Sequence, residues 1–418
     1  MIENLQKQCK ENLTVKRVIA ICDSSVISLE NEKNRLEDTK GLYNIGQKPN
    51  NKESLGFIIH PILVHERDSG ILRGVANIKI LARPTKGNKR SKEWNRKKYP
   101  IEEKESYKWI APCLEVQDTV LSKSEHILYV MDREGDIIET FDRLKTKKSD
   151  VLIRSNHNRR VKDEKGQALK INELLSREKK VKTIRIKVKG KKRKKRTAIV
   201  DIKVAQAYLQ WPSDKKVKEK KNPEGIKVSI IEVRERNNKG YKNEPALVWT
   251  LITTENIETT DESIDIIRCY VERWKVEEFF KLLKSDGFDI EKTELTKGRS
   301  IRKLTLIIMK ASVKVLLLKS VREGQSELTV EEVFDTDEIS CLQLINTDLN
   351  GTTKKQQNPH NEESLAWATW IIARLGGWKE FYNKKRPPGN KTLVWGLQKF
   401  DAIMVGFNIA KMKLKDVS

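Results

Sequence analysis

Acidic side chains that could hold metal ions follow apolar segments of this sequence. Asp23 ends the apolar run from Val15 to Cys22, and Asp132 ends the segment HILYVM. A third acid, Glu277, lies in the helical pattern YVERWKVEEFFKLLK. Phosphodiester chemistry suits such a set, because hard oxygen ligands hold two Mg²⁺ ions about 3.5–4 Å apart. We predict that Asp23, Asp132 and Glu277 form one metal site, although a single strand-end aspartate more often caps a turn or helix.

Basic side chains accompany the glutamate in that helical pattern. Read as one helix, it places five side chains at steps of 3, 4, 4 and 3 residues, which puts them on one face: Tyr270, Arg273, Glu277, Lys281 and Lys284. Three cations and a phenol around one carboxylate would suit a groove that receives an anionic partner.

The hydrophobic pattern predicts the elements that position these residues. Strand patterns at residues 15–22 and 56–66 and in the segments HILYVM and DVLIRSNHNRR (150–160) indicate an α/β sheet whose strand ends carry the aspartates. Residues 161–247 alternate in a β manner, around the charge run Lys189 to Arg196. We favour a solvated hairpin for that run over a specific DNA site. A long helix begins near Thr260, and the patterns are helical from Ile301 onwards.

Composition points to a polyanionic partner. The 418 residues carry 84 Lys plus Arg against 59 Asp plus Glu, which gives a formal net charge of +25. Such a basic balance favours nucleic acid, with a merely soluble basic protein as the alternative.

Other classes of protein lack their sequence signals here. The five cysteines have no zinc spacing and are typical of a reducing cytoplasm without a disulfide framework. No run of 18 apolar residues predicts a membrane span. HExxH, GxSxG and P-loop motifs are missing, which disfavours zinc, serine and NTP hydrolysis. His60 and His126 lie in apolar runs and are expected to be packed or capped rather than ligands.

Several motifs resemble one family. The spacing Tyr-x2-Arg-x3-Glu-x6-Lys at residues 270–284 resembles the Y-R-E-K motif of bacterial cut-and-paste DDE transposases of the insertion-sequence-four group, of the Tn-five type. AICDSSVISL resembles the segment with the first catalytic aspartate, and YVMDREGDI the segment with the second. EKESYKWI resembles the loop between them, and AWATWIIARLGGW the C-terminal dimerisation region. The matches run in order along nearly the whole chain.

The resemblance implies a fold and a domain organisation. The expected fold is α/β, with a ribonuclease-H-like core of mixed sheet and flanking helices, formed by residues 1–160 and 248–300. Residues 161–247 would form an inserted β-rich subdomain, and residues 301–418 a helical C-terminal dimerisation domain.

The resemblance also implies roles for single residues. Asp23, Asp132 and Glu277 would bind two Mg²⁺ or Mn²⁺ ions as the catalytic triad. Trp249 would stack on a flipped base, although a core aromatic in a strand is an equal alternative. The residues that would contact DNA are Tyr270, Arg273, Lys281, Lys284, Arg154 and Trp249.

The implied activity is DNA transposition. Metal-dependent cleavage, hairpin formation and strand transfer would act on transposon ends and target DNA, without NTP. A homodimer would form through the C-terminal region on DNA. The chain would act in the bacterial cytoplasm at the nucleoid.

Two other interpretations stay open. Only 22 residues precede Asp23, so we expect the family's N-terminal DNA-binding module to be missing. The chain could then be a truncated, non-catalytic inhibitor that acts by dimerising. A weaker alternative is a general basic protein that binds DNA or RNA.

Overall fold

The protein is described from a computed structural model of the chain. The residues that it describes are 1–13, 16–29, 36, 46–48, 51–82, 99–188, 196–212, 220–236, 245–324, 327–354, 356–379 and 386–415.

Five strands form the central part of one mixed sheet. In spatial order they are β5 (Leu72–Leu81), β4 (Asn51–Glu66), β1 (Arg17–Cys22), β6 (His126–Met131) and β7 (Ser149–Arg154). β4 is antiparallel to both β1 and β5, whereas β6 and β7 run parallel to β1. This order and these directions are those of a ribonuclease-H-like core. Two short strands, β2 (Ser25–Ser28) and β3 (Gly46–Lys48), also pair with β4.

Further strands continue the same sheet beyond β7. β13 (Val248–Thr253) pairs antiparallel with β7, followed by β12 (Ile226–Glu235) and β11 (Arg196–Leu209). The remaining strands attach to β11 and its neighbours: β10 (Lys182–Val188), β8 (Arg160–Lys162) and β9 (Ala168–Lys170). The segment from residue 161 to 247 is therefore rich in strands that extend the core sheet. β10 and β11 form a hairpin, but residues 189–195 of the charge run lie outside the described residues.

Both faces of the central sheet are covered, because consecutive side chains of each strand point to opposite sides. In β1, Ile19 and Ile21 join one buried cluster while Val18, Ala20 and Cys22 join another. Helices on the second side include α2 (Ala111–Asp118), α3 (Ile138–Leu144) and α4 (Ile171–Arg177). α1 (Ile2–Glu11) packs on β5.

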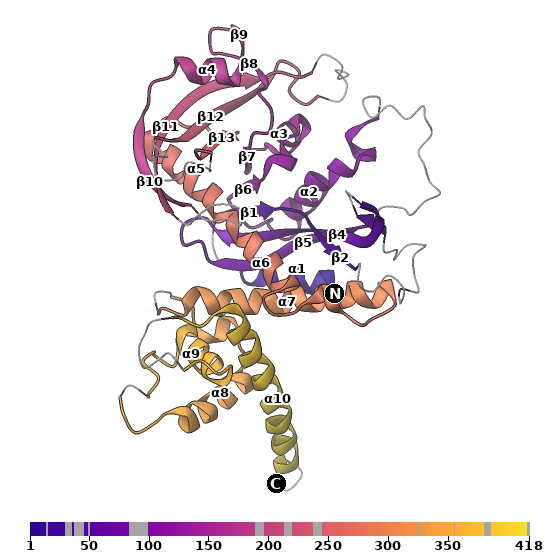
Figure 1. Cartoon of the computed structure of the whole chain (residues 1–418), viewed down its shortest axis with the longest axis vertical. Helices are drawn as coiled ribbons and strands as arrows, with labels where there is room; N and C mark the ends of the chain where they lie inside the picture. The colour runs from indigo at the N-terminus through magenta and orange to yellow at the C-terminus, as the bar shows by residue number, and fades with distance from the viewer. Residues whose placement is uncertain are drawn as a thin grey trace.

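Two consecutive helices cover the first side. α5 (Thr260–Glu272) starts at a capping box formed by Thr259 and Glu262, as the acids near Thr260 predict. α6 (Trp274–Lys284) continues it and leads to α7 (Gly298–Val321). Figure 1 shows α7 lying between the sheet and the C-terminal helices. Short 3-10 turns connect the longer elements at Ile101–Glu103, Glu105–Trp109, Arg133–Gly135, Ile290–Lys292 and Val330–Glu332.

The C-terminal region is helical. It contains α8 (Thr336–Leu349), α9 (Leu365–Leu375) and α10 (Asn390–Lys415). α9 and α10 approach to backbone contact, since a Cβ added at Gly396 would lie 1.8 Å from the carbonyl oxygen of Ile372. α10 extends away from the rest of the chain towards the C-terminus (Figure 1).

The predicted fold class is confirmed. A large mixed sheet is flanked by helices, and a helical region follows at the C-terminus. The proposed domain boundaries stay a prediction. Within the described part of the chain, the helices are too short or too polar to cross a membrane.

Candidate active site

Two of the predicted metal ligands follow neighbouring parallel strands. Asp23 comes directly after β1 and Asp132 directly after β6, so both lie at the carboxyl edge of the sheet. Asp23 Oδ1 accepts the backbone N–H of Ser24 at 2.7 Å. Asp132 Oδ1 accepts the N–H of Glu134 at 2.8 Å and so caps the turn that follows. Each aspartate keeps its second oxygen for other partners.

Glu277 reaches the same edge from α6, and Arg273 joins it to Asp23. Arg273 Nη1 lies 3.0 Å from Asp23 Oδ2, and its Nη2 lies 2.9 Å from Glu277 Oε1. A single guanidinium thus holds oxygens of two candidate ligands. The Arg273 side chain is 11% exposed and the Glu277 side chain 42% exposed, so the cluster opens to solvent on the glutamate side.

Like charges and burial act strongly on Asp23. Burial, followed by the charge of Asp132, raises the pKa of Asp23 to about 7, against the opposing effects of Arg273 and the Ser24 N–H. The charge of Glu277 adds to the rise. Because the pKa of Asp23 responds to both other acids, the three carboxylates belong to one electrostatic neighbourhood. Their assignment as a catalytic triad stays a prediction.

The expected single helix is two helices in the structure: α5 ends at Glu272 and α6 begins at Trp274, with Arg273 between them. Arg273 nevertheless lies beside both Tyr270 and Glu277, as neighbours on one face would. Tyr270 is only 3% exposed and packs edge-on against Trp249, with ring centroids 5.3 Å apart.

Most of the predicted DNA contacts are paired within the protein in this structure. Trp249 is 7% exposed and offers no open ring face, as the core alternative predicts. Arg154 Nη2 donates to the carbonyl oxygen of Val248 at 3.1 Å. Lys284 donates to the carbonyl of Val26 and is 26% exposed, whereas the Lys281 side chain is 57% exposed beside Asp286. The roles of these residues in DNA binding stay predictions.

A second acidic cluster lies at the opposite edge of the sheet, where β6 and β7 begin. The ligand atoms of His126, Asp150 and Glu255 lie within 4.8 Å of one another, which would permit a metal ion. Among the residues that the structure describes, Asp23, Asp132 and Glu277 do not form such a tight group.

The second cluster is, however, already neutralised by cations. Arg67 binds Glu255 through two nitrogens and also bonds Asp265, and Lys145 binds Asp150. A metal ion would have to displace these partners, so the cluster fits a structural ion-pair network better. The sequence prediction that His126 is not a ligand agrees with this reading, although His126 does hydrogen-bond Asp150 at 3.0 Å.

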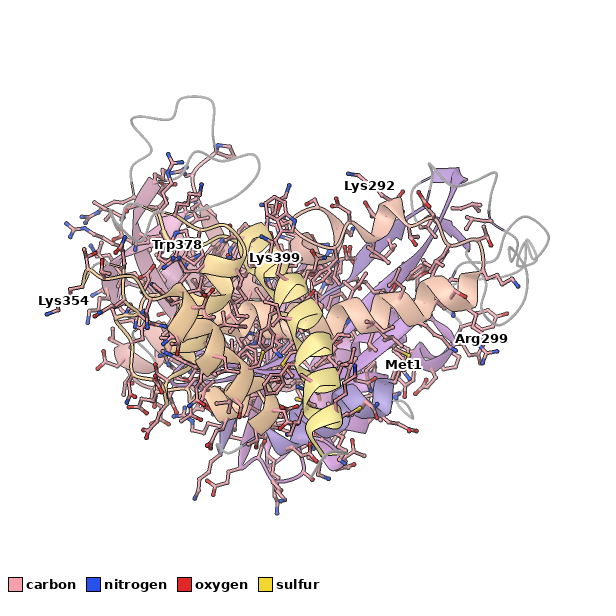
Figure 2. All side chains as sticks on the ribbon, turned by 90° about the horizontal axis from the view of Figure 1, so that it is seen from below. Met1, Lys292, Arg299, Lys354, Trp378 and Lys399 are labelled. Carbon is pink, nitrogen blue, oxygen red and sulfur yellow. The ribbon has the colours of Figure 1, made fainter. Side chains whose placement is uncertain are left out.

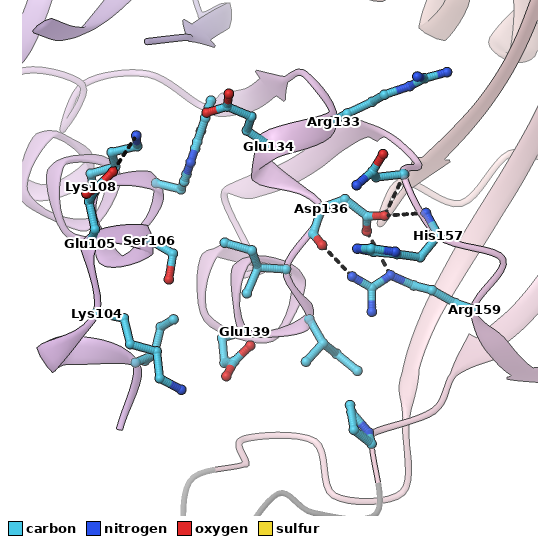
Figure 3. Close-up of a pocket in the computed structure, with 16 residues that line it drawn as sticks. Lys104, Glu105, Ser106, Lys108, Arg133, Glu134, Asp136, Glu139, His157 and Arg159 are labelled. Atoms are coloured by element: carbon cyan, nitrogen blue, oxygen red, sulfur yellow. Dashed lines mark hydrogen bonds and ion pairs between the residues drawn. The ribbon is translucent and has the colours of Figure 1, made fainter. Parts of the chain in front are cut away.

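A pocket of about 710 Å³ adjoins Asp132, lined partly by the Arg133–Gly135 turn and the Glu105–Trp109 turn. Figure 3 shows Asp136 at its wall, facing His157 and Arg159. Asp136 accepts hydrogen bonds from the Asn156 N–H and from Arg159 Nε, both at 2.7 Å. The other labelled side chains carry both signs of charge, so the pocket does not select for one charge of ligand.

The contact of His60 with Ser24, next to Asp23, was not predicted from the sequence. His60, in β4, is fully buried, and its Nδ1 lies 2.9 Å from Ser24 Oγ. Burial, followed by the nearby charge of Lys108, lowers the pKa of His60 to about 3 and keeps the ring neutral. The sequence correctly predicts a packed histidine, but β4 and β1 must pair before His60 can reach the residue next to Asp23.

A comparison with known families bears on the site. Residues 111–313 match the family model described as transposase DDE domain. This match, over just under half of the chain, is consistent with the predicted DDE transposase character. Asp132 and Glu277 lie within the matched range, whereas Asp23 precedes it.

A solved structure is also similar, at low level. It is that of piggyBac transposase in a synaptic complex with hairpin DNA, with 10% identity and a TM-score of 0.31. The similarity covers 78% of this chain and 62% of that chain. At this TM-score it adds nothing to what the strand order already shows.

Proposed function

We propose that the chain is a metal-dependent DNA transposase of the bacterial insertion-sequence-four group that acts in the cytoplasm at the nucleoid. The observation that carries the proposal is the approach of Asp23 and Glu277 to one guanidinium, beside Asp132 on the adjacent parallel strand. The match of residues 111–313 to the transposase DDE domain supports it independently.

The residues at this edge fit divalent ions. Carboxylate oxygens are the ligands that Mg²⁺ and Mn²⁺ prefer. Among the described residues, one guanidinium, that of Arg273, pairs with two of the three acids, Asp23 and Glu277. Bound ions would supply an activated water and stabilise the leaving oxygen of a phosphodiester. Asp23, Asp132 and Glu277 would hold them, as two ions in the complete site.

The protein's own residues have further roles in this proposal. Lys281 presents an exposed cation one turn beyond Glu277, where it would bind a DNA phosphate. Tyr270 and Trp249 would contribute only if their buried side chains moved on binding, and Arg154 only if it left the carbonyl oxygen of Val248. The freed 3′-hydroxyl would attack the opposite strand to form a hairpin, and the end would later join target DNA.

A cleavage assay tests this function. The substrates are DNA duplexes built from the two flanks of the gene, incubated with Mn²⁺ or Mg²⁺. We expect nicked and hairpin products from the unchanged protein, and DNA binding without nicking from Glu277→Gln. Glu278→Gln is the matched control, because Glu278 pairs with Lys319 and is half exposed. Nicking that survives Glu277→Gln would refute the proposed site.

A specific observation favours dimerisation as a second candidate function. α10 exposes apolar side chains at the helical spacing of 4 and 3 residues, namely Val405 at 62%, Ile409 at 53% and Met412 at 67%. Figure 2 shows α10, with Lys399 labelled, lying across the face seen from below. We propose that a second copy of the chain covers this stripe when DNA is bound.

The same dimer would form if the chain were a non-catalytic inhibitor. If the chain acts as an inhibitor, it dimerises but cleaves no DNA. Sedimentation with and without DNA measures the dimer, and Ile409→Asp should abolish it. Lys413→Asp, which changes charge beside the stripe, is the control. A monomer under every condition would refute both the homodimer and the inhibitor.

A further inference from the structure

Arg273 lies inside the carboxylate cluster rather than at the surface. Its two terminal nitrogens bind oxygens of Asp23 and Glu277, and its side chain is 11% exposed. Its third nitrogen, Nε, is buried without a hydrogen-bond partner. At the protein surface, water would satisfy all the N–H donors of a guanidinium. The buried position of Arg273 therefore indicates that its main role is to bind the two carboxylates.

The position also decides which oxygens are open to a metal ion. Asp23 Oδ1 accepts the Ser24 N–H, so Oδ2 is the oxygen left for a ligand role, and Arg273 holds it. Metal–oxygen bonds to Mg²⁺ are about 2.0–2.1 Å long, whereas the guanidinium stands at hydrogen-bond distance from the same atoms. A divalent metal ion and the Arg273 guanidinium therefore compete for the same carboxylate oxygens.

Arg273 packs beside two aromatic rings at a helix junction. It stands at the joint between α5 and α6, and the Tyr270 and Trp274 rings both lie 5.9 Å from its guanidinium carbon. A rotation of the side chain alone would release both carboxylates. The freed fork of N–H donors matches a phosphate in geometry and charge.

We propose that Arg273 is a positioning residue: it holds Asp23 and Glu277 together as their counter-cation until divalent metal replaces it, and then passes to a DNA phosphate. This inference rests on the proposed function, because it needs metal at these carboxylates. Metal and DNA would then favour the same released position of Arg273. Each should strengthen the binding of the other, since coupling between two ligands is reciprocal.

Mn²⁺ titration by calorimetry, without DNA, tests the competition. We expect Arg273→Gln to bind Mn²⁺ about 10-fold more tightly than the unchanged protein, within the 5–150-fold range usual for coupled sites. Arg273→Lys, whose single ammonium serves one carboxylate at a time, should fall between them and guards against a folding defect. Arg268→Gln, in the adjoining helix α5, is the control, since Arg268 pairs with Asp265 away from the site.

The coupling is measured by repeating the titration with bound duplex DNA. DNA should tighten Mn²⁺ binding to the unchanged protein about 10-fold, and this gain should vanish in Arg273→Gln. Equal or weaker Mn²⁺ binding by Arg273→Gln would overturn the inference alone. Mn²⁺ binding that does not change in Asp23→Asn and Glu277→Gln would instead overturn the proposed function.

Discussion

The two acidic clusters lie at opposite edges of the same sheet and differ in charge balance. At the edge where β6 and β7 begin, Asp150, Glu255 and Asp265 are bound by Lys145, Arg67 and Arg268. At the edge where β1 and β6 end, one cation among the described residues, Arg273, binds both Asp23 and Glu277.

This difference separates a structural network from a candidate functional site. A buried charge is tolerated when each carboxylate has its own cation, and the network then connects β6, β7, β13 and α5. At the other edge burial, followed by the charge of Asp132, instead raises the pKa of Asp23, and Glu277 adds to the rise. A further positive charge would stabilise these carboxylates. Ligand spacing alone would select the cluster of His126, Asp150 and Glu255 as the metal site, because it is the tighter group.

The largest expected effect is on cleavage, and it compares one aspartate from each edge. Asp23→Asn removes a proposed metal ligand, so DNA nicking should fall by more than about 100-fold. A loss of about 100-fold is the largest usually seen when a residue that only hydrogen-bonds to a metal ligand is removed. Asp150→Asn should leave nicking within a few-fold of the unchanged protein. Single-turnover nicking in Mn²⁺ measures both, and equal losses would erase the functional distinction between the edges.

The next largest effect is on stability, at the edge where β6 and β7 begin. Arg67→Met leaves Glu255 and Asp265 without their buried partner, whose side chain is 4% exposed. We expect the free energy of unfolding to fall by about 3–5 kcal/mol. Urea denaturation measures it.

The control for that loss is Arg17→Met. Arg17 makes an exposed pair with Asp68 at 3.6 Å, and its removal should cost less than about 1 kcal/mol. If both substitutions cost the same, the network does not stabilise the fold.

The pH dependence of stability should have opposite signs at the two edges. The raised pKa of Asp23 means that the folded state binds its proton more tightly, so its contribution is present below pH 3.8 and is lost as pH rises to about 7. Burial pushes the pKa of Asp150 up, but hydrogen bonds from His126, Lys145 and Thr254 lower it overall. The contribution of Asp150 is therefore full above pH 3.8 and lost as pH falls below it.

Urea denaturation of the metal-free protein across this pH range measures the two signs. With rising pH, Asp23→Asn should gain stability relative to the unchanged protein, whereas Asp150→Asn should lose it. Parallel curves for the two variants would show that the edges are electrostatically alike.

The smallest effect concerns His126. Its substitution tests whether the cluster of His126, Asp150 and Glu255 binds a metal ion. His126→Asn removes the 3.0 Å hydrogen bond to Asp150 and should cost about 1 kcal/mol of stability. Mn²⁺ affinity, measured by calorimetry, should not change. A clear loss of affinity would assign metal to this edge and reverse the comparison.

The sequence by itself determined the elements and the identity of the candidate ligands. Apolar runs fix β1 and β6, so the aspartates that end them fall at the same edge once the strands pair in parallel. The acids near Thr260 fix the start of α5 through a capping box. These features depend on local periodicity and caps, which a single sequence carries.

Only the tertiary structure decided what each side chain does. Tyr270 is buried beside Trp249, the Arg273 guanidinium lies between Asp23 and Glu277, and Lys281 is exposed. The pairing of β4 with β1 brings His60 close to Asp23. His60 Nδ1 lies 2.9 Å from Oγ of the neighbouring Ser24, which is 36 residues away along the chain. Arg67 finds Glu255 across 188 residues. Such contacts depend on packing between distant segments, and the spacing of residues along one chain contains no record of which cation will meet which acid.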